Sequence, residues 1–152
     1  MARSVLLVDD DPDVRALLGE FLTKQGFVVH AARDGRHALQ VLSHIEPPDV
    51  ILLDYQMPVL NGSQFLARKR RNPRLRCIPV VILSAWTSVW TPTKLDAVEA
   101  LTKPLDLERT LAVVKHICDG SHAIHISARK AGRDRALTRV QGRSETAGAR
   151  LP

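Results

Sequence analysis

The chain has 152 residues, of which 45% are hydrophobic, and this length suits one domain with a single buried core rather than a two-domain enzyme. Its formal net charge of +6 is unevenly distributed, because residues 1–120 carry 15 Lys and Arg against 14 Asp and Glu, whereas residues 121–152 carry 7 against 2. The body of the chain is therefore nearly neutral, and the basic character belongs to its C-terminal stretch.

The two cysteines, Cys77 and Cys118, are too few for a disulfide framework and too far apart for a metal-binding CxxC pair. Reduced thiols are the ordinary state of such residues in the cytosol. The first apolar run, at residues 5–8, is too short for a signal peptide or a membrane span. We therefore expect a cytoplasmic protein that does not engage a membrane.

Short apolar runs alternate with helical patterns along the chain. Continuous runs of this kind are typical of strands that helices bury on both faces, and they lie at residues 5–8, 27–32, 50–53 and 80–83. The first helix is predicted to begin at Pro12, after Asp11 as its N-cap, and to end before Gly26. Further helices are predicted at residues 35–45, 63–71 and 106–119.

A fifth strand is predicted at residues 97–102, although this run is short. The segment before it, residues 85–96, has few residues that could form a helix, and Pro92 interrupts it. Strands that alternate with helices predict an α/β fold, here a doubly wound five-stranded parallel sheet with a shortened fourth helix region.

From His122 onward the apolar periodicity fades, and Arg, Ala, Gly and Ser dominate the sequence. A segment of this composition buries too little apolar surface to fold on its own. We therefore expect residues 1–120 to form the folded domain and residues 121–152 to be a basic, flexible C-terminal tail.

Polar residues follow the predicted strands at the end where a doubly wound sheet binds its ligands. These residues are Asp9-Asp10-Asp11 after the first strand, Asp54 after the third, Ser84 after the fourth and Thr102-Lys103-Pro104 after the fifth. The aspartate triplet alone would be no more than a helix N-cap with a charge that suits the helix dipole. Together, however, the four segments predict one polar site at a single edge of the sheet.

Asp9, Asp10 and Asp54 would repel one another at such an edge unless a cation intervenes. An oxygen-only cluster with open positions suits Mg²⁺ and an incoming phosphate. A carboxylate can attack phosphorus when the charge on the transferring oxygens is neutralised, and the Lys103 ammonium and the Ser84 hydroxyl are available for that purpose.

Four segments resemble a known family. VLLVDDDPDV, VILLDYQMPVLNG, VVILSA and LTKP are similar to the signature segments of response-regulator receiver domains, in the family's order and near its spacing. Together they cover about residues 3–120. The resemblance implies a flavodoxin-like fold with strand order 2-1-3-4-5, and a stand-alone receiver domain of a two-component system.

Carried over residue by residue, the resemblance implies a phosphoacceptor at Asp54. Asp10 and Asp54 would be direct Mg²⁺ ligands, Asp9 would act directly or through water, and Gln56 would offer its backbone carbonyl. Such a domain takes its phosphoryl group from a sensor histidine kinase or a phosphotransfer protein in a phosphorelay, and signals through contacts with a downstream protein. Its only catalysis would be Mg²⁺-dependent self-phosphorylation and slow autodephosphorylation.

Ser84 and Lys103 complete the site that the resemblance implies. Ser84 would donate a hydrogen bond to a phosphoryl oxygen, and Lys103 would pair with the carboxylate or the phosphate. Pro104 stands where the family is expected to have a cis peptide bond after the lysine, which would help to fix the ammonium group.

The sequence departs from the family near its last strand. Receivers usually carry an aromatic residue a few positions before the lysine, and this residue turns inward on phosphorylation; here the position is Ala100. The segment from Ser84 to Lys103 is shorter than usual and contains Trp86 and Trp90, which either anchor a partner or cover the crevice. These differences leave phosphorylation in place and predict a different output switch, with the segment that holds the tryptophans as its moving part.

Other functions are disfavoured by particular residues. A phosphatase of the haloacid-dehalogenase type also uses an Asp nucleophile, but its general acid would stand at Gln56. The 32 residues of the tail cannot build a helix-turn-helix reader, which disfavours sequence-specific DNA binding. A degenerate receiver and a nucleic-acid-associated regulator that acts through its basic tail remain as alternatives. The basic stretch RKRRNPRLR at residues 68–76 is attributed to a solvated helix end rather than to a nucleic-acid patch.

Overall fold

The structure, a computed structural model, describes residues 2–85 and 97–120. Residues Met1–Cys118 form one compact unit. The predicted tail, residues 121–152, lies outside the described residues, so its flexibility and the domain boundary at residue 120 stay predictions. Trp86, Trp90 and most of the predicted short fourth helix region also lie outside them.

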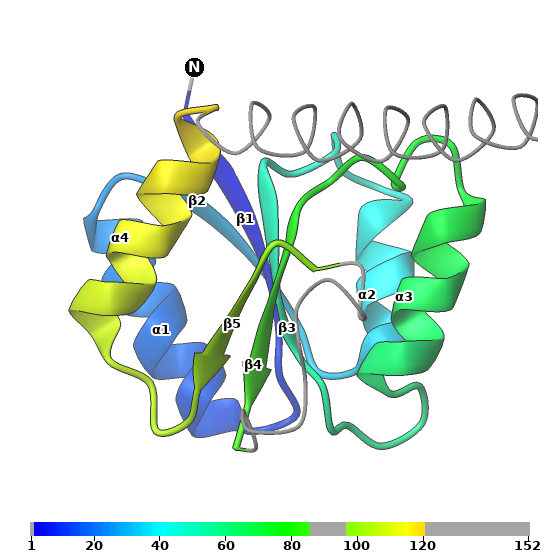
Figure 1. Cartoon of the computed structure of the whole chain (residues 1–152), viewed down its shortest axis with the longest axis horizontal. Helices are drawn as coiled ribbons and strands as arrows, with labels where there is room; N and C mark the ends of the chain where they lie inside the picture. Colours follow the sequence, from blue (N-terminus) through cyan, green and yellow to red (C-terminus); the bar gives the residue numbers. More distant parts are fainter. Residues whose placement is uncertain (1, 86–96, 121–152) are drawn as a thin grey trace, which may run out of the picture. The chain divides into compact units, whose positions relative to one another are not determined.

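Five parallel strands form one sheet in the order β2-β1-β3-β4-β5 (Figure 1). The fold class and the strand order predicted from the sequence are therefore confirmed. β3 and β4 are buried along their whole length, as their continuous apolar sequences predict, whereas the edge strand β5 is only partly buried. The strands are β1 Ser4–Val8, β2 Val28–Ala32, β3 Val50–Asp54, β4 Val80–Ser84 and β5 Glu99–Thr102.

The four helices within the described residues lie where the sequence predicts them: α1 at Pro12–Lys24, α2 at Gly35–Leu42, α3 at Gly62–Arg71 and α4 at Leu107–Cys118. Asp11 caps α1 as predicted, because its side chain accepts a hydrogen bond from the backbone N–H of Asp13. α2 ends at Leu42 rather than at residue 45, with Ser43 as its C-cap. Within residues 2–85 and 97–120, no helix is long and apolar enough to cross a membrane.

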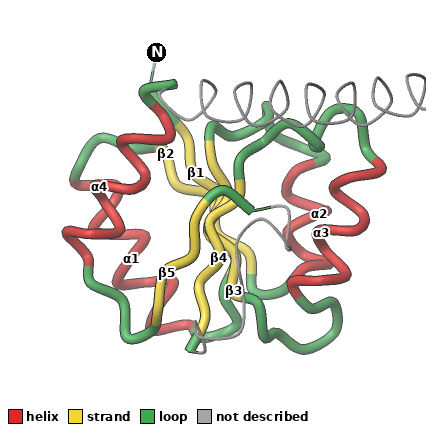
Figure 2. The backbone as a smooth tube through the Cα atoms, viewed as in Figure 1, coloured by secondary structure: helices red, strands yellow, loops and turns green. Residues whose placement is uncertain are grey.

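Helices α1 and α4 cover one face of the sheet, and α2 and α3 cover the other (Figures 1 and 2). Alternate strand residues point to opposite faces. Val5 and Leu7 of β1 therefore belong to the core cluster that includes Leu18 of α1, whereas Leu6 and Val8 belong to the cluster that includes Phe65 of α3. The two clusters pack the sheet between its helices and leave its carboxyl edge to the loops.

The loop between β3 and α3 is held at both ends by close backbone contacts. The N–H of Gly62 donates to the carbonyl of Tyr55 at 3.0 Å, and the N–H of Gly35 donates to the carbonyl of Leu60 at 3.1 Å. A Cβ atom at Gly35 would lie 2.5 Å from the Leu60 oxygen, and one at Gly62 would lie 2.8 Å from Tyr55 Cα. Both glycines are therefore required by the close approach of the backbone.

The middle of the same loop contains a strained turn. Val59 has a φ of 68° and is 71% exposed, and the N–H of Leu60 donates to the carbonyl of Pro58 at 2.8 Å. A hydrogen bond between residues two apart, around a residue of positive φ, is the less favourable form of the γ-turn. A β-branched residue in this region stores conformational energy.

Replacing Gly35 with Ala should lower the free energy of unfolding by about 1–3 kcal/mol, because the new methyl group would overlap the Leu60 carbonyl. Gly19→Ala is the matched control, since a Cβ atom there meets only Val29 Cγ1 at 3.9 Å, and it should raise the stability of α1 by about 0.5–1 kcal/mol. Urea unfolding measures both. If Gly35→Ala is as stable as the parent protein, the loop accommodates a side chain at this position without cost.

Candidate functional site

The carboxyl ends of four strands deliver polar residues to one edge of the sheet. Asp9 follows β1, Asp54 ends β3, Ser84 ends β4 and Lys103 follows β5. Backbone hydrogen bonds continue past the strand ends, since the N–H of Lys103 donates to the Ser84 carbonyl at 2.9 Å and that of Asp9 to the Ala32 carbonyl at 3.1 Å. The sheet therefore fixes the backbone positions from which these side chains project.

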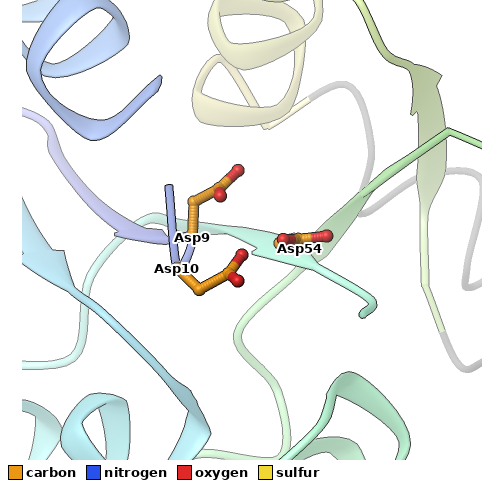
Figure 3. A group of neighbouring side chains, drawn as sticks. All are labelled: Asp9, Asp10 and Asp54. Atoms are coloured by element: carbon orange, nitrogen blue, oxygen red, sulfur yellow. The ribbon is translucent and has the colours of Figure 1, made fainter. Parts of the chain in front are cut away.

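Three carboxylates meet at this edge. One carboxylate oxygen from each of Asp9, Asp10 and Asp54 lies within 4.8 Å of the others. Asp9 is fully buried and Asp54 is 5% exposed, whereas Asp10 is exposed at the rim. Figure 3 shows the Asp10 carboxylate directed toward Asp54. The clustering of the three aspartates that the sequence predicts is thus present in the structure.

Lys103 supplies the positive charge within the site. Its Nζ lies 2.7 Å from Oδ2 of Asp9 and 3.4 Å from Oδ2 of Asp54. The other oxygen of Asp9, Oδ1, accepts a hydrogen bond from the backbone N–H of Asp11 at 2.9 Å. Asp54 has weaker contacts, because the N–H of Gln56 lies 3.3 Å from its Oδ1. The charge of Asp9 is therefore better satisfied than that of Asp54.

The protonation of Asp54 reflects this imbalance. Burial raises the pKa of Asp54, the negative charge of Asp9 raises it further, and the result is about 7 because Lys103 offsets these effects only in part. Burial lowers the pKa of Lys103, but its hydrogen bond to Asp9 and its attraction to Asp54 outweigh burial and raise that pKa above its usual value. The site holds more negative charge than its own cation balances.

The remaining predicted site residues take different positions. Ser84 is buried at the end of β4, with its hydroxyl group at the same edge of the sheet as Asp54. The side chain of Gln56 is exposed, and its role as a carbonyl ligand stays a prediction. The Lys103–Pro104 peptide bond is cis, as the family resemblance implies. Ala100 is half-buried beside Ile82 and packs against the core on the α2 and α3 face.

Arg15 is a contributor that the sequence analysis did not identify. Its Nη1 donates to the backbone carbonyl of Asp9 at 2.6 Å and so fixes the peptide that joins Asp9 to Asp10. A cation near the N-terminus of a helix is disfavoured by the helix dipole unless a partner compensates it. A basic residue in the first turn of α1, where the dipole disfavours it, was therefore the sequence signal that Arg15 has a compensating partner.

Residues 5–115 match the response regulator receiver domain family. The chain belongs to this family. It is 35% identical to PilH of Pseudomonas aeruginosa over 124 residues, which cover 79% of this chain and 100% of PilH. It is 34% identical to the regulatory protein AtoC of Escherichia coli over 114 residues, which cover 73% of this chain but only 24% of AtoC. This receiver domain thus spans about a quarter of AtoC and the whole of PilH.

Solved receiver structures share the fold. The chemotaxis response regulator CheY4 of Vibrio cholerae matches with a TM-score of 0.69 at 29% sequence identity, over 77% of this chain and 99% of CheY4. The receiver domain of sensor histidine kinase PA1611 from Pseudomonas aeruginosa, which has a magnesium ion coordinated in its active-site cleft, matches with a TM-score of 0.70. That likeness concerns the fold, since the identity is 22%, and it covers 78% of this chain and 99% of the PA1611 domain.

The metal-free receiver domain should lose stability as the pH rises from about 4 to about 7. The pKa of Asp54 is raised in the folded state to about 7, so the folded protein binds a proton that the unfolded chain has already released, and ionisation then weakens folding. Urea unfolding in EDTA should show a loss of about 1–3 kcal/mol over this range. Asp54→Asn should remove most of that loss, and an identical pH profile for parent and variant would contradict the shift.

Proposed function

We propose that this receiver domain accepts a phosphoryl group on Asp54 in a Mg²⁺-dependent reaction. The observation that carries the proposal is the meeting of Asp9, Asp10 and Asp54 beside the Lys103 ammonium. Their negative charge exceeds the local positive charge, and the raised pKa of Asp54 expresses that excess. Such a pocket favours a divalent cation and, with that cation, an anionic reactant.

The donor set fits Mg²⁺, because it offers oxygen ligands only and leaves positions open for water and phosphate. Asp10 and Asp54 would hold the ion directly. Asp9 already accepts hydrogen bonds at both carboxylate oxygens, which favours a role through water, and the Gln56 carbonyl would complete the protein ligands. When bound, Mg²⁺ neutralises the carboxylates and the phosphoryl oxygens. The magnesium ion in the PA1611 receiver supports this assignment.

In the proposed reaction a carboxylate oxygen of Asp54 attacks phosphorus. The new bond joins this oxygen to phosphorus while the bond from phosphorus to an imidazole nitrogen of the donor breaks, and the electron pair stays on the imidazole. The donor is a sensor histidine kinase or a histidine phosphotransfer protein. Lys103 neutralises an oxygen of the transferred group from its place between Asp9 and Asp54, and the Ser84 hydroxyl donates a hydrogen bond to another.

Storage of the phosphoryl group, rather than turnover, is the function these residues favour. A phosphatase that uses an Asp nucleophile needs a general acid two residues further on, and Gln56 cannot donate a proton in that way. Slow loss of the group to water would return Asp54 to its free state. A degenerate receiver is less well supported, because the acceptor, the cluster carboxylates and the lysine are all brought together.

The phosphorylated domain would signal through contacts with a downstream protein. The small side chain of Ala100 cannot perform the aromatic rotation that couples phosphate to surface in many receivers. A role for Trp86 and Trp90 in that coupling, and a contact of residues 121–152 with nucleic acid, concern residues outside the described ranges and stay predictions.

Treatment with acetyl phosphate and Mg²⁺ should add the mass of one phosphoryl group to the parent chain, because Asp54 is the carboxylate with unsatisfied charge. Asp54→Asn should show no gain, since an amide is a far weaker nucleophile. Glu108→Gln on α4 makes the same chemical change at an exposed carboxylate outside the cluster and should leave labelling intact. Intact-mass spectrometry reads all three, and full labelling of the Asp54 variant would refute the assignment.

Mg²⁺ should raise the stability of the parent by about 1–2 kcal/mol when its concentration is about tenfold above the dissociation constant. Asp10→Ala should abolish most of this gain, because it removes one of the two proposed direct ligands. Asp13→Ala, an exposed carboxylate in the first turn of α1, should retain it. Thermal unfolding with Mg²⁺ and with EDTA gives the comparison, and an undiminished gain in the Asp10 variant would place the metal elsewhere.

A further inference from the structure

The two helical layers of the domain differ in charge. α2 and α3 lie together on one face of the sheet, and neither contains an acidic residue within its bounds (Figure 1). The opposite layer is mixed: α1 contains both acids and bases, among them the Glu20–Lys24 ion pair at 2.8 Å, and α4 contains Glu108 beside Arg109. The loops on either side of α3 add to this difference in charge, because residues 55–85 contain six basic residues and no acidic one.

Two of these six basic residues are part of the architecture. Lys69 is 4% exposed, and its Nζ donates to the carbonyl of Arg76 at 3.1 Å. Arg74 donates from Nη1 to the Leu42 carbonyl at 3.2 Å and from Nη2 to the Ile45 carbonyl at 2.7 Å. These contacts tie the loop after α3 to the helix itself and to the end of α2. The loop after α3 is therefore held in place against α3 and the end of α2.

Four other arginines remain exposed here, and three of them, Arg68, Arg71 and Arg76, are called the α3 arginine surface. Within residues 2–85 and 97–120, no carboxylate forms an ion pair with any of them. Arg68 and Arg71 are three positions apart on α3 and so share its solvent face, where like charges destabilise a helix. The helix dipole favours basic residues in the last turn, but it does not act on Arg76, which lies beyond that turn.

We infer that the α3 arginine surface binds a carboxylate-rich segment of a partner protein. Arginine holds a planar carboxylate with two parallel hydrogen bonds, and the single lysine of the helix is turned inward and unavailable. A nucleic acid is a poorer occupant, because the only aromatic residue of α3, Phe65, is buried and cannot stack on a base. Three arginines would also neutralise few phosphates, which gives weak binding at physiological salt.

The α3 arginine surface lies away from the acidic site. α3 begins beside the loop that follows Asp54 and runs for ten residues, so its two ends lie about 15 Å apart. A partner segment held there would leave Asp54 accessible to its phosphoryl donor. The inference therefore goes beyond the phosphoacceptor proposal and does not depend on it.

Fluorescence anisotropy with a labelled peptide of alternating Glu and Ser tests the inference on the full, unphosphorylated chain. The same peptide with Gln in place of Glu is the ligand control and should not bind. The double variant R68E/R71E should weaken binding of the acidic peptide by about tenfold or more, since it removes two charge-assisted contacts and introduces repulsion. R109E/K115E on α4 changes the net charge by the same amount and should weaken binding by less than about threefold.

If both double variants weaken binding of the acidic peptide equally, the binding depends on net charge alone, and the inference is wrong. No weakening by R68E/R71E would place the binding elsewhere, for example in the basic residues 121–152, and would also overturn it. Tighter binding of a DNA duplex than of the acidic peptide, with the same sensitivity to R68E/R71E, would make the surface a nucleic-acid site instead. Arg76→Glu lies outside the helix and repeats the test without a charge reversal inside α3, should the double variant unfold.

Discussion

The constraint that governs this domain is the excess negative charge held at one edge of a buried sheet. Asp9 is fully buried, Asp54 nearly so, and the single ammonium group of Lys103 serves both. Repulsion of this kind opposes folding, and it is tolerated because the two apolar clusters on either face of the sheet are complete without the polar edge. The carboxylates are thus held by a scaffold whose stability lies elsewhere, and they remain receptive to whatever neutralises them.

The architecture separates the tasks of the molecule in space. The proposed chemistry belongs to the carboxyl edge, where strand ends and the loop after β3 converge. The loop after α3, near the far end of that helix, is secured by Lys69 and Arg74, two cations that donate hydrogen bonds to backbone carbonyls. Cations used in this way hold the loop in place at the end of the helical layer that lies away from the acidic edge.

Much of this arrangement follows from the sequence, and the parts that do not have identifiable causes. β3 and β4 were predictable because their apolar runs are continuous, and Asp54 and Ser84 because polar residues directly follow such runs. The pairing of Lys103 with Asp9 spans 94 positions, and the sequence predicted only that the Lys103 ammonium would lie in the acidic site. The early end of α2 and the anchoring role of Arg74 depend on contacts across about thirty residues, which local patterns do not encode. Arg15 was missed because its partner is a backbone carbonyl, and a carbonyl has no signature in the sequence.

The strained turn at Val59 has a consequence for efforts to raise the thermal stability of this protein. A branched side chain in left-handed backbone costs on the order of 1 kcal/mol or more, and this one is 71% exposed, so its apolar burial returns little. Asparagine adopts the same backbone conformation with less strain. An engineer seeking a more heat-tolerant version would therefore begin at Val59, an exposed position where relief of strain leaves the buried core unchanged.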